Sequence, residues 1–94
     1  MARATWNGAV LAESDDIVEV EGNLYFPADA LNRDLVEPSD HATVCGWKGT
    51  ASYYDLVVAG QRNPEAVWFY PTPMAGAEAV ADRVAFWHGV TVEA

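Results

Sequence analysis

Hydrophobic and polar residues alternate over short stretches of this chain, and turn-forming residues separate the stretches. In residues 16–21, Val18 and Val20 point to one face and Glu19 and Glu21 to the other, which is the pattern of a half-buried β-strand. Residues 52–58 and 66–70 are rich in β-branched and aromatic side chains, and residues 59–64 are predicted to form the loop between them. The pattern therefore predicts several short strands.

Three dipeptides that contain glycine predict tight turns between such strands. Asn7-Gly8 is a strong signal for a type I′ hairpin turn. It is predicted to place two pairs of residues opposite each other: Trp6 with Ala9, and Ala4 with Leu11. Gly22-Asn23 is predicted to join strands at 16–21 and 24–27, and His88-Gly89 strands at 84–87 and 90–93.

Two stretches are not predicted to be strands. Residues 28–35 carry Leu31 and Leu35 four positions apart, and residues 75–81 are rich in alanine and glutamate, so each is expected to form one or two helical turns.

Many short strands with regular turns predict a single, mainly β domain over residues 1–94. Its architecture is expected to be a small antiparallel barrel or sandwich with one or two short helices.

Composition limits the partners of this domain. The chain has 94 residues and a formal net charge of −9, and it has no cluster of Lys or Arg, so a nucleic-acid partner is not expected. No apolar run approaches the roughly 20 residues that a membrane-spanning helix needs, so a membrane partner is not expected either. A single cysteine and the lack of a signal-like N-terminus predict a cytoplasmic protein.

Reactive and aromatic residues are concentrated between positions 43 and 54. This segment holds the only cysteine (Cys45), the only lysine (Lys48), Trp47 and Tyr53. The lysine has two interpretations: a cation at the mouth of an aromatic pocket, or a side chain that covers the core and pairs with an acidic neighbour. If Trp68 and Tyr70, which share one face of a strand, lie on the same side as this segment, they complete an aromatic cleft.

Familiar catalytic and metal-binding motifs are not found. Residues 46–50 contain glycines and a lysine but lack the spacing of a phosphate-binding loop. Glu19 and Glu21 have the spacing of a Mg²⁺ pair, but a solvent-facing position on the strand explains the same alternation and is the preferred interpretation. His41 lies about 13 Å from Cys45 on an extended segment, too far for a thiol–imidazole pair. One cysteine and two histidines do not complete a zinc site, so no metal and no cofactor are predicted.

Motifs along nearly the whole chain resemble the domain of unknown function 427 family, which also carries a nucleotidyltransferase label. The resemblance is strongest at Cys-Gly-Trp-Lys-Gly, where Gly46 replaces the proline usual in the family. It rests on residues 6–8, 11–12, 25–27, 39, 43–53, 66–71 and 84–86. The resemblance implies a β-tent fold similar to the thalidomide-binding domain of cereblon. The paired Cys-x-x-Cys zinc motifs of many β-tent proteins are absent, and the residues give no support to the nucleotidyltransferase label.

Three classes of function stay open at this point. The first is a module that binds a small planar or acidic molecule in an aromatic-lined pocket, for which six residues are the candidates: Cys45, Trp47, Lys48, Tyr53, Trp68 and Tyr70. Gly46 and Gly49 are expected to let the backbone turn there. The second is a protein-interaction module, present as a monomer or weak homodimer. The third is an enzyme that uses Cys45, Lys48 or a tyrosine hydroxyl.

Overall fold

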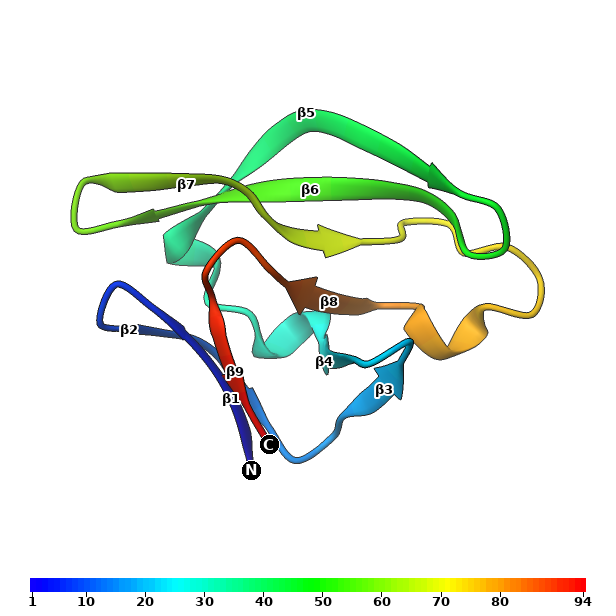
Figure 1. Ribbon diagram of the computed structural model, residues 1–94, viewed down its shortest axis with the longest axis horizontal. Helices are drawn as coiled ribbons and strands as arrows, with labels where there is room; N and C mark the ends of the chain where they lie inside the picture. Colours follow the sequence, from blue (N-terminus) through cyan, green and yellow to red (C-terminus); the bar gives the residue numbers. More distant parts are fainter.

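Two antiparallel sheets make up the computed structural model, which describes residues 1–94 (Figure 1). The smaller sheet has the order β2-β1-β9 and consists of β1 (Ala2–Trp6), β2 (Ala9–Ser14) and β9 (Thr91–Glu93). The larger has the order β3-β4-β8-β7-β6-β5 and consists of β3 (Val18–Val20), β4 (Asn23–Pro27), β5 (Val36–Cys45), β6 (Gly49–Val58), β7 (Gln61–Phe69) and β8 (Arg83–Phe86). The predicted fold class, a mainly antiparallel β domain, is confirmed.

The short helices expected at 28–35 and 75–81 are single 3₁₀ turns: η1 (Ala28–Ala30), η2 (Arg33–Leu35) and η3 (Glu78–Val80). Residues 28–35 do not form one continuous helix because their middle pairs with β2. Leu31 forms a β-bridge with Ala12, and the Asn32 N–H donates to the Leu11 carbonyl at 2.8 Å. Asn32 then caps η2 by accepting from the Asp34 N–H at 3.1 Å. No helix of the structure has the length and apolar character needed to span a membrane.

Four tight turns have the form X-Gly with both residues at positive φ, as type I′ turns require. Asn7-Gly8 is one of them and places Trp6 opposite Ala9, as predicted. The second turn is Glu21-Gly22 rather than the expected Gly22-Asn23, and it places Val20 opposite Asn23. The predicted loop at 59–64 is also wrong: the turn is only Ala59-Gly60, and β7 already begins at Gln61.

A β-bulge changes the register of β1 with β2. Ala4 lies opposite Ala12 rather than Leu11, because Leu11 is the extra residue between the pairs Ala4–Ala12 and Thr5–Val10. The bulge turns two adjacent residues, Leu11 and Ala12, into the core, where both are buried. The expected pairing of Ala4 with Leu11 is therefore wrong, and the need to bury both side chains accounts for the difference.

The turn at His88-Gly89 exists, with φ values of 55° and 84°, but it does not close the predicted hairpin. β8 pairs with β4 and β7, whereas β9 pairs with β1. The turn thus carries the chain from the larger sheet to the smaller one, next to β1, and the two termini lie close together (Figure 1). Trp87, immediately before this turn, follows the last residue of β8 and is partly exposed.

Both faces of the larger sheet are covered, and strand alternation divides the core between them. In β4 and β8, Phe26 and Val84 pack in the cluster shared with the smaller sheet, whereas Tyr25 and Ala85 belong to the cluster on the opposite face. The segment that contains η3 packs on that opposite face through Val80. Trp68 and Tyr70 of the β7 region share this second face, while Phe69 lies on the first, as the alternation predicts.

Candidate functional site

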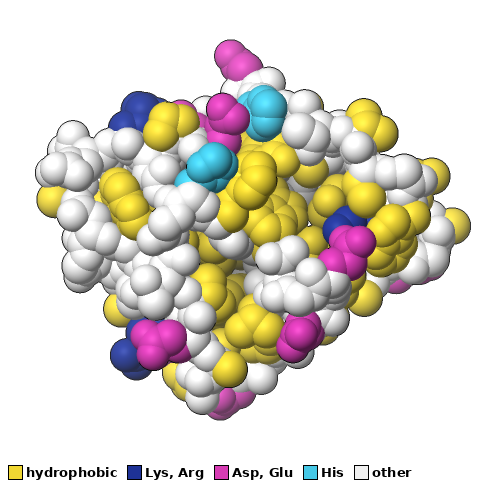
Figure 2. Space-filling model, viewed as in Figure 1, with side chains coloured by type: hydrophobic (Ala, Val, Ile, Leu, Met, Phe, Trp, Pro, Cys, Tyr) yellow, Lys and Arg dark blue, Asp and Glu magenta, His cyan; other side chains and the backbone are white.

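A cavity of about 270 Å³ opens on the second face of the larger sheet, lined by Asn23, Lys48, Tyr53, Trp68, Tyr70 and Trp87. Four of the six candidate residues therefore lie together, although the sequence places them in two separate stretches, 48–53 and 68–70. In Figure 2, hydrophobic side chains gather near the middle of the face in view, and the two histidines border them. His41 packs against the Tyr53 ring and His88 against the Trp87 ring, with centroids 4.7 and 4.2 Å apart.

The aromatic walls hold one another in place. Trp87 stacks on Tyr53 with centroids 6.1 Å apart and meets Trp68 edge-on at 5.6 Å. Hydrogen bonds fix two of these rings further: Trp68 Nε1 donates to the Tyr25 hydroxyl at 3.1 Å, and the hydroxyls of Tyr53 and Thr43 lie 2.8 Å apart. Rings held by both packing and hydrogen bonds form a largely pre-organised surface, which is typical of ligand cavities.

Lys48 supplies the only cation of the cavity and is just 6% exposed. Its ammonium pairs with Glu21 and lies 5.3 Å from the Trp47 ring centroid and 5.5 Å from that of Tyr70. Burial alone would lower the pKa of Lys48, but the hydrogen bond to Glu21 and the neighbouring tyrosines outweigh it, so the pKa is raised. Lys48 thus remains an ammonium, and its hydrogen bond lowers the pKa of Glu21.

The β5–β6 hairpin positions this lysine through a three-residue loop, Gly46-Trp47-Lys48. Gly49 follows with φ of 116°, and a Cβ at that position would lie 3.2 Å from the Thr72 carbonyl oxygen. The Lys48 carbonyl accepts from the Met74 N–H at 2.9 Å, which ties the loop to the segment after β7. The close approach therefore requires glycine at 49. Gly46 has no positive φ, so the expected backbone role applies only to Gly49.

Trp47 and Cys45 lie beside the cavity but do not line it. Trp47 is 45% exposed, and its ring lies beside the Lys48 ammonium. Cys45 is a half-buried free thiol at the end of β5, and the backbone N–H groups of Trp47 and Lys48 lower its pKa. His41, which the spacing places too far from the thiol, instead lies 3.5 Å from a Glu65 carboxylate oxygen.

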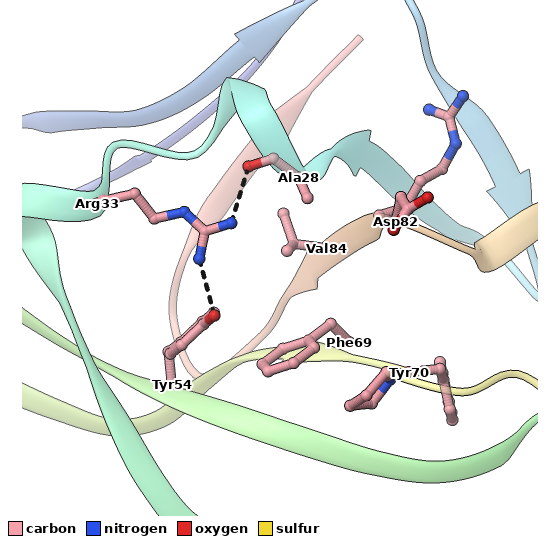
Figure 3. A pocket seen from close by; sticks show the side chains of 9 residues that line it. Ala28, Arg33, Tyr54, Phe69, Tyr70, Asp82 and Val84 are labelled. Atoms are coloured by element: carbon pink, nitrogen blue, oxygen red, sulfur yellow. Dashed lines mark hydrogen bonds between the residues drawn. The ribbon is translucent and has the colours of Figure 1, made fainter.

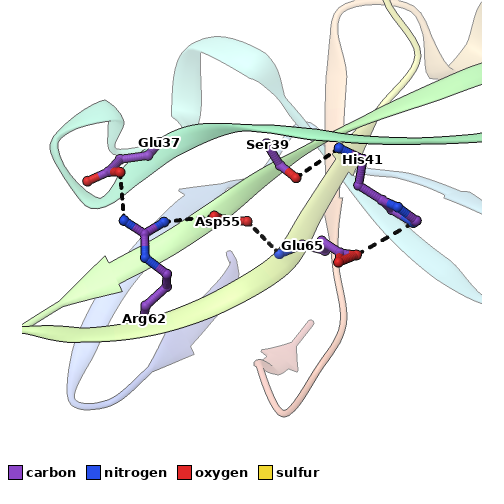
Figure 4. Close-up of polar contacts among 6 residues, drawn as sticks. All are labelled: Glu37, Ser39, His41, Asp55, Arg62 and Glu65. Carbon is purple, nitrogen blue, oxygen red and sulfur yellow. Dashed lines mark hydrogen bonds and ion pairs between the residues drawn. The ribbon is translucent and has the colours of Figure 1, made fainter.

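A second bulge, in β7, holds the Trp87 wall of the cavity in place. Between the pairs Tyr54–Val67 and Leu56–Asn63, the β7 strand carries extra residues opposite Asp55. The Asp55 carboxylate accepts from the Glu65 N–H at 2.8 Å and from Arg62 at 2.7 Å, as Figure 4 shows. The Glu65 carbonyl accepts from the Trp87 indole N–H, and its carboxylate faces His41.

Sequence reasoning missed two lining residues, Trp87 and Asn23. Trp87 was expected to end the strand at 84–87, before the His88-Gly89 turn that was predicted to close a hairpin. Asn23 was assigned to a turn, whereas it begins β4 opposite Val20. No local signal in the sequence marks either residue. Their placement depends on the order of the strands in the larger sheet.

The fold and the site define a small β protein of two antiparallel sheets, with an aromatic cavity that holds one buried ammonium. The family model described as Domain of unknown function (DUF427) matches residues 1–94, the whole chain. The protein belongs to this family, in agreement with the resemblance of its motifs. No curated protein is significantly similar to the chain.

Proposed function

We propose that this protein binds a small planar molecule in the aromatic cavity, with a carbonyl or carboxylate oxygen of the ligand facing Lys48. The observation that carries the proposal is the convergence of Tyr53, Trp68, Tyr70 and Trp87 with one ammonium around about 270 Å³. Sites for drug-sized ligands have volumes of about 300–1,000 Å³, so this cavity suits a smaller, metabolite-sized molecule.

The chemistry of the walls selects such a ligand. Ring faces offer stacking to a planar guest, and their hydrogen bonds keep them from rearranging. An ammonium has three N–H donors, and Lys48 uses one on Glu21, so donors remain for a ligand oxygen. Glu21 offsets most of the Lys48 charge, and the chain carries a net charge of −9, so a multiply charged anion is disfavoured.

The test compares two tryptophans of similar exposure, Trp87 at 42% and Trp47 at 45%. A library of small planar fragments is screened against the protein by saturation-transfer NMR, and the hits are titrated against Trp87→Leu and Trp47→Leu. The variant Trp87→Leu removes a cavity wall and is expected to weaken binding by about tenfold, because a stacked ring contributes about 1 kcal/mol or more. Trp47→Leu is expected to retain most of the affinity. Hits that bind both variants like the unmodified protein would contradict the proposal.

A second function is favoured by one observation: three large apolar side chains, Val44, Trp47 and Met74, are exposed around the β5–β6 hairpin tip. Val44 and Trp47 belong to the hairpin, and the Met74 N–H bonds to it at Lys48. Exposed apolar groups that lie close together are typical of interaction surfaces. In this alternative the protein is a homodimerisation or interaction module. Sedimentation that gives the monomer mass at all concentrations would count against homodimerisation.

A further inference from the structure

A second cavity, of about 220 Å³, lies against the opposite face of the larger sheet and plays no part in the function proposed above. Its walls include Arg33, Tyr54, Phe69, Asp82 and Val84. Figure 3 shows Arg33 and Asp82 on opposite sides of this cavity, with the rings of Tyr54 and Phe69 between them along one wall.

Arg33 is unusual among the basic side chains of this acidic protein, because it forms no ion pair. The other four each contact at least one carboxylate: Arg3 with Glu13, Lys48 with Glu21, Arg62 with Glu37 and Asp55, and Arg83 with Asp16. Arg33 instead donates to two neutral oxygens, the Tyr54 hydroxyl at 2.7 Å and the Ala28 carbonyl at 3.3 Å. The chain has 14 acidic residues, yet none of them neutralises this guanidinium.

These contacts hold the guanidinium at the cavity and leave part of it free. Tyr54 stacks on Phe69 with centroids 4.6 Å apart and an interplanar angle of 22°, and Arg33 lies 5.5 Å from the Tyr54 centroid. The Ala28 N–H donates to the Asp82 carbonyl at 2.8 Å, which fixes the acceptor on the other side. A guanidinium has five N–H donors, and two are used here, so three remain for a ligand.

We infer that this cavity is a binding site for a small monocarboxylate with an apolar body. The carboxylate would accept from the free N–H groups of Arg33, which match its planar geometry. The apolar body would lie against Phe69 and Val84, the latter being buried. Arg83 also lines this cavity, but it is paired with Asp16, and the Asp82 carboxylate in the same wall disfavours a dianion such as phosphate because like charges repel.

The experiment titrates ¹⁵N-labelled protein with benzoate, with its neutral isostere benzamide, and with inorganic phosphate. Benzoate is expected to shift the amide signals of Tyr54 and Phe69 and the Nε–H signal of Arg33, and benzamide and phosphate are expected to bind at least about tenfold more weakly. Arg33→Gln is expected to weaken benzoate binding to the same degree. The control Arg3→Gln also changes the net charge from −9 to −10 (4 basic minus 14 acidic residues) but lies outside this cavity, and it is expected to bind benzoate normally.

Equal binding of benzoate and benzamide, or tighter binding of phosphate, would overturn the inference, and neither comparison needs a variant. Unchanged benzoate affinity in Arg33→Gln would overturn it as well. Shifts confined to Lys48, Trp68 and Trp87 would place benzoate in the aromatic cavity. That result would support the function proposed above and refute the Arg33 site, so the two proposals fail separately.

Discussion

Replacing Asp55 with alanine is expected to destabilise the protein and to loosen the wall of the aromatic cavity. The carboxylate, whose side chain is 16% exposed, accepts from the Glu65 N–H and from Arg62. Glu65 has φ of 59°, a conformation that residues other than glycine rarely adopt. Asp55 therefore holds a bulge in an unfavourable backbone conformation, and that bulge supplies the carbonyl that binds the Trp87 indole.

The magnitude follows from the two contacts that alanine removes. Loss of the acceptor leaves a partly buried N–H unsatisfied, which costs about 1–3 kcal/mol. The contact with the half-exposed Arg62 contributes about 0–1 kcal/mol. A total near 2 kcal/mol lowers the Tm of a domain of this size by about 8–16 °C.

Urea unfolding of Asp55→Ala and of the control Asp55→Asn measures this effect. Both variants change the net charge by the same amount, but asparagine keeps an oxygen that can accept from the Glu65 N–H. We expect alanine to cost at least twice as much free energy of unfolding as asparagine, and the Trp87 indole N–H signal to move only in the alanine variant. Equal losses in the two variants would show that charge, rather than the hydrogen bond, is what matters, and the reasoning about the bulge would be refuted.

Two further predictions concern the cavity and its margin. Lys48→Met should change the free energy of unfolding by no more than about 1 kcal/mol, because relief from burying a charge offsets the lost ion pair, and it should lower the affinity for any fragment hit about tenfold. A loss of several kcal/mol in urea unfolding would make Lys48 a structural partner instead. Cys45 should be alkylated by iodoacetamide with a pH midpoint below the ordinary thiol pKa, because a lowered pKa leaves more thiolate at neutral pH. A midpoint at or above the ordinary value would contradict the stabilisation of the thiolate by the Trp47 and Lys48 N–H groups.

Local rules predicted much of this fold. Period-two alternation correctly assigned Trp68 and Tyr70 to one face and Phe69 to the other, because the pleat of a strand fixes these directions. The Asn7-Gly8 turn was correct because both residues tolerate positive φ. The single lysine between Trp47 and Gly49 led to the prediction of a cation beside aromatic side chains, and Lys48 lines one cavity together with Tyr53, Trp68 and Tyr70.

The errors have physical causes that a local reading does not reveal. Ala59-Gly60 forms a turn with both residues at positive φ, and because alanine rarely adopts positive φ, no local signal predicted a turn this short. Bulges bury adjacent residues, as with Ala66 and Val67, which breaks the alternation on which strand assignment depends. The position of Trp87 follows from the pairing of β9 with β1, a contact between the two ends of the chain.

Alternation of side chains along β6 and β7 explains why one short protein has two cavities with aromatic walls. Tyr53 and Trp68 face one side of the larger sheet and Tyr54 and Phe69 the other, so adjacent residues on paired strands supply walls to both hollows. Tyr70 follows the last residue of β7 and lines both. The difference between the cavities therefore lies in charge rather than in their aromatic walls. Glu21 pairs with Lys48 on one face, whereas no carboxylate pairs with Arg33 on the other, so the second cavity presents the cation that is less compensated.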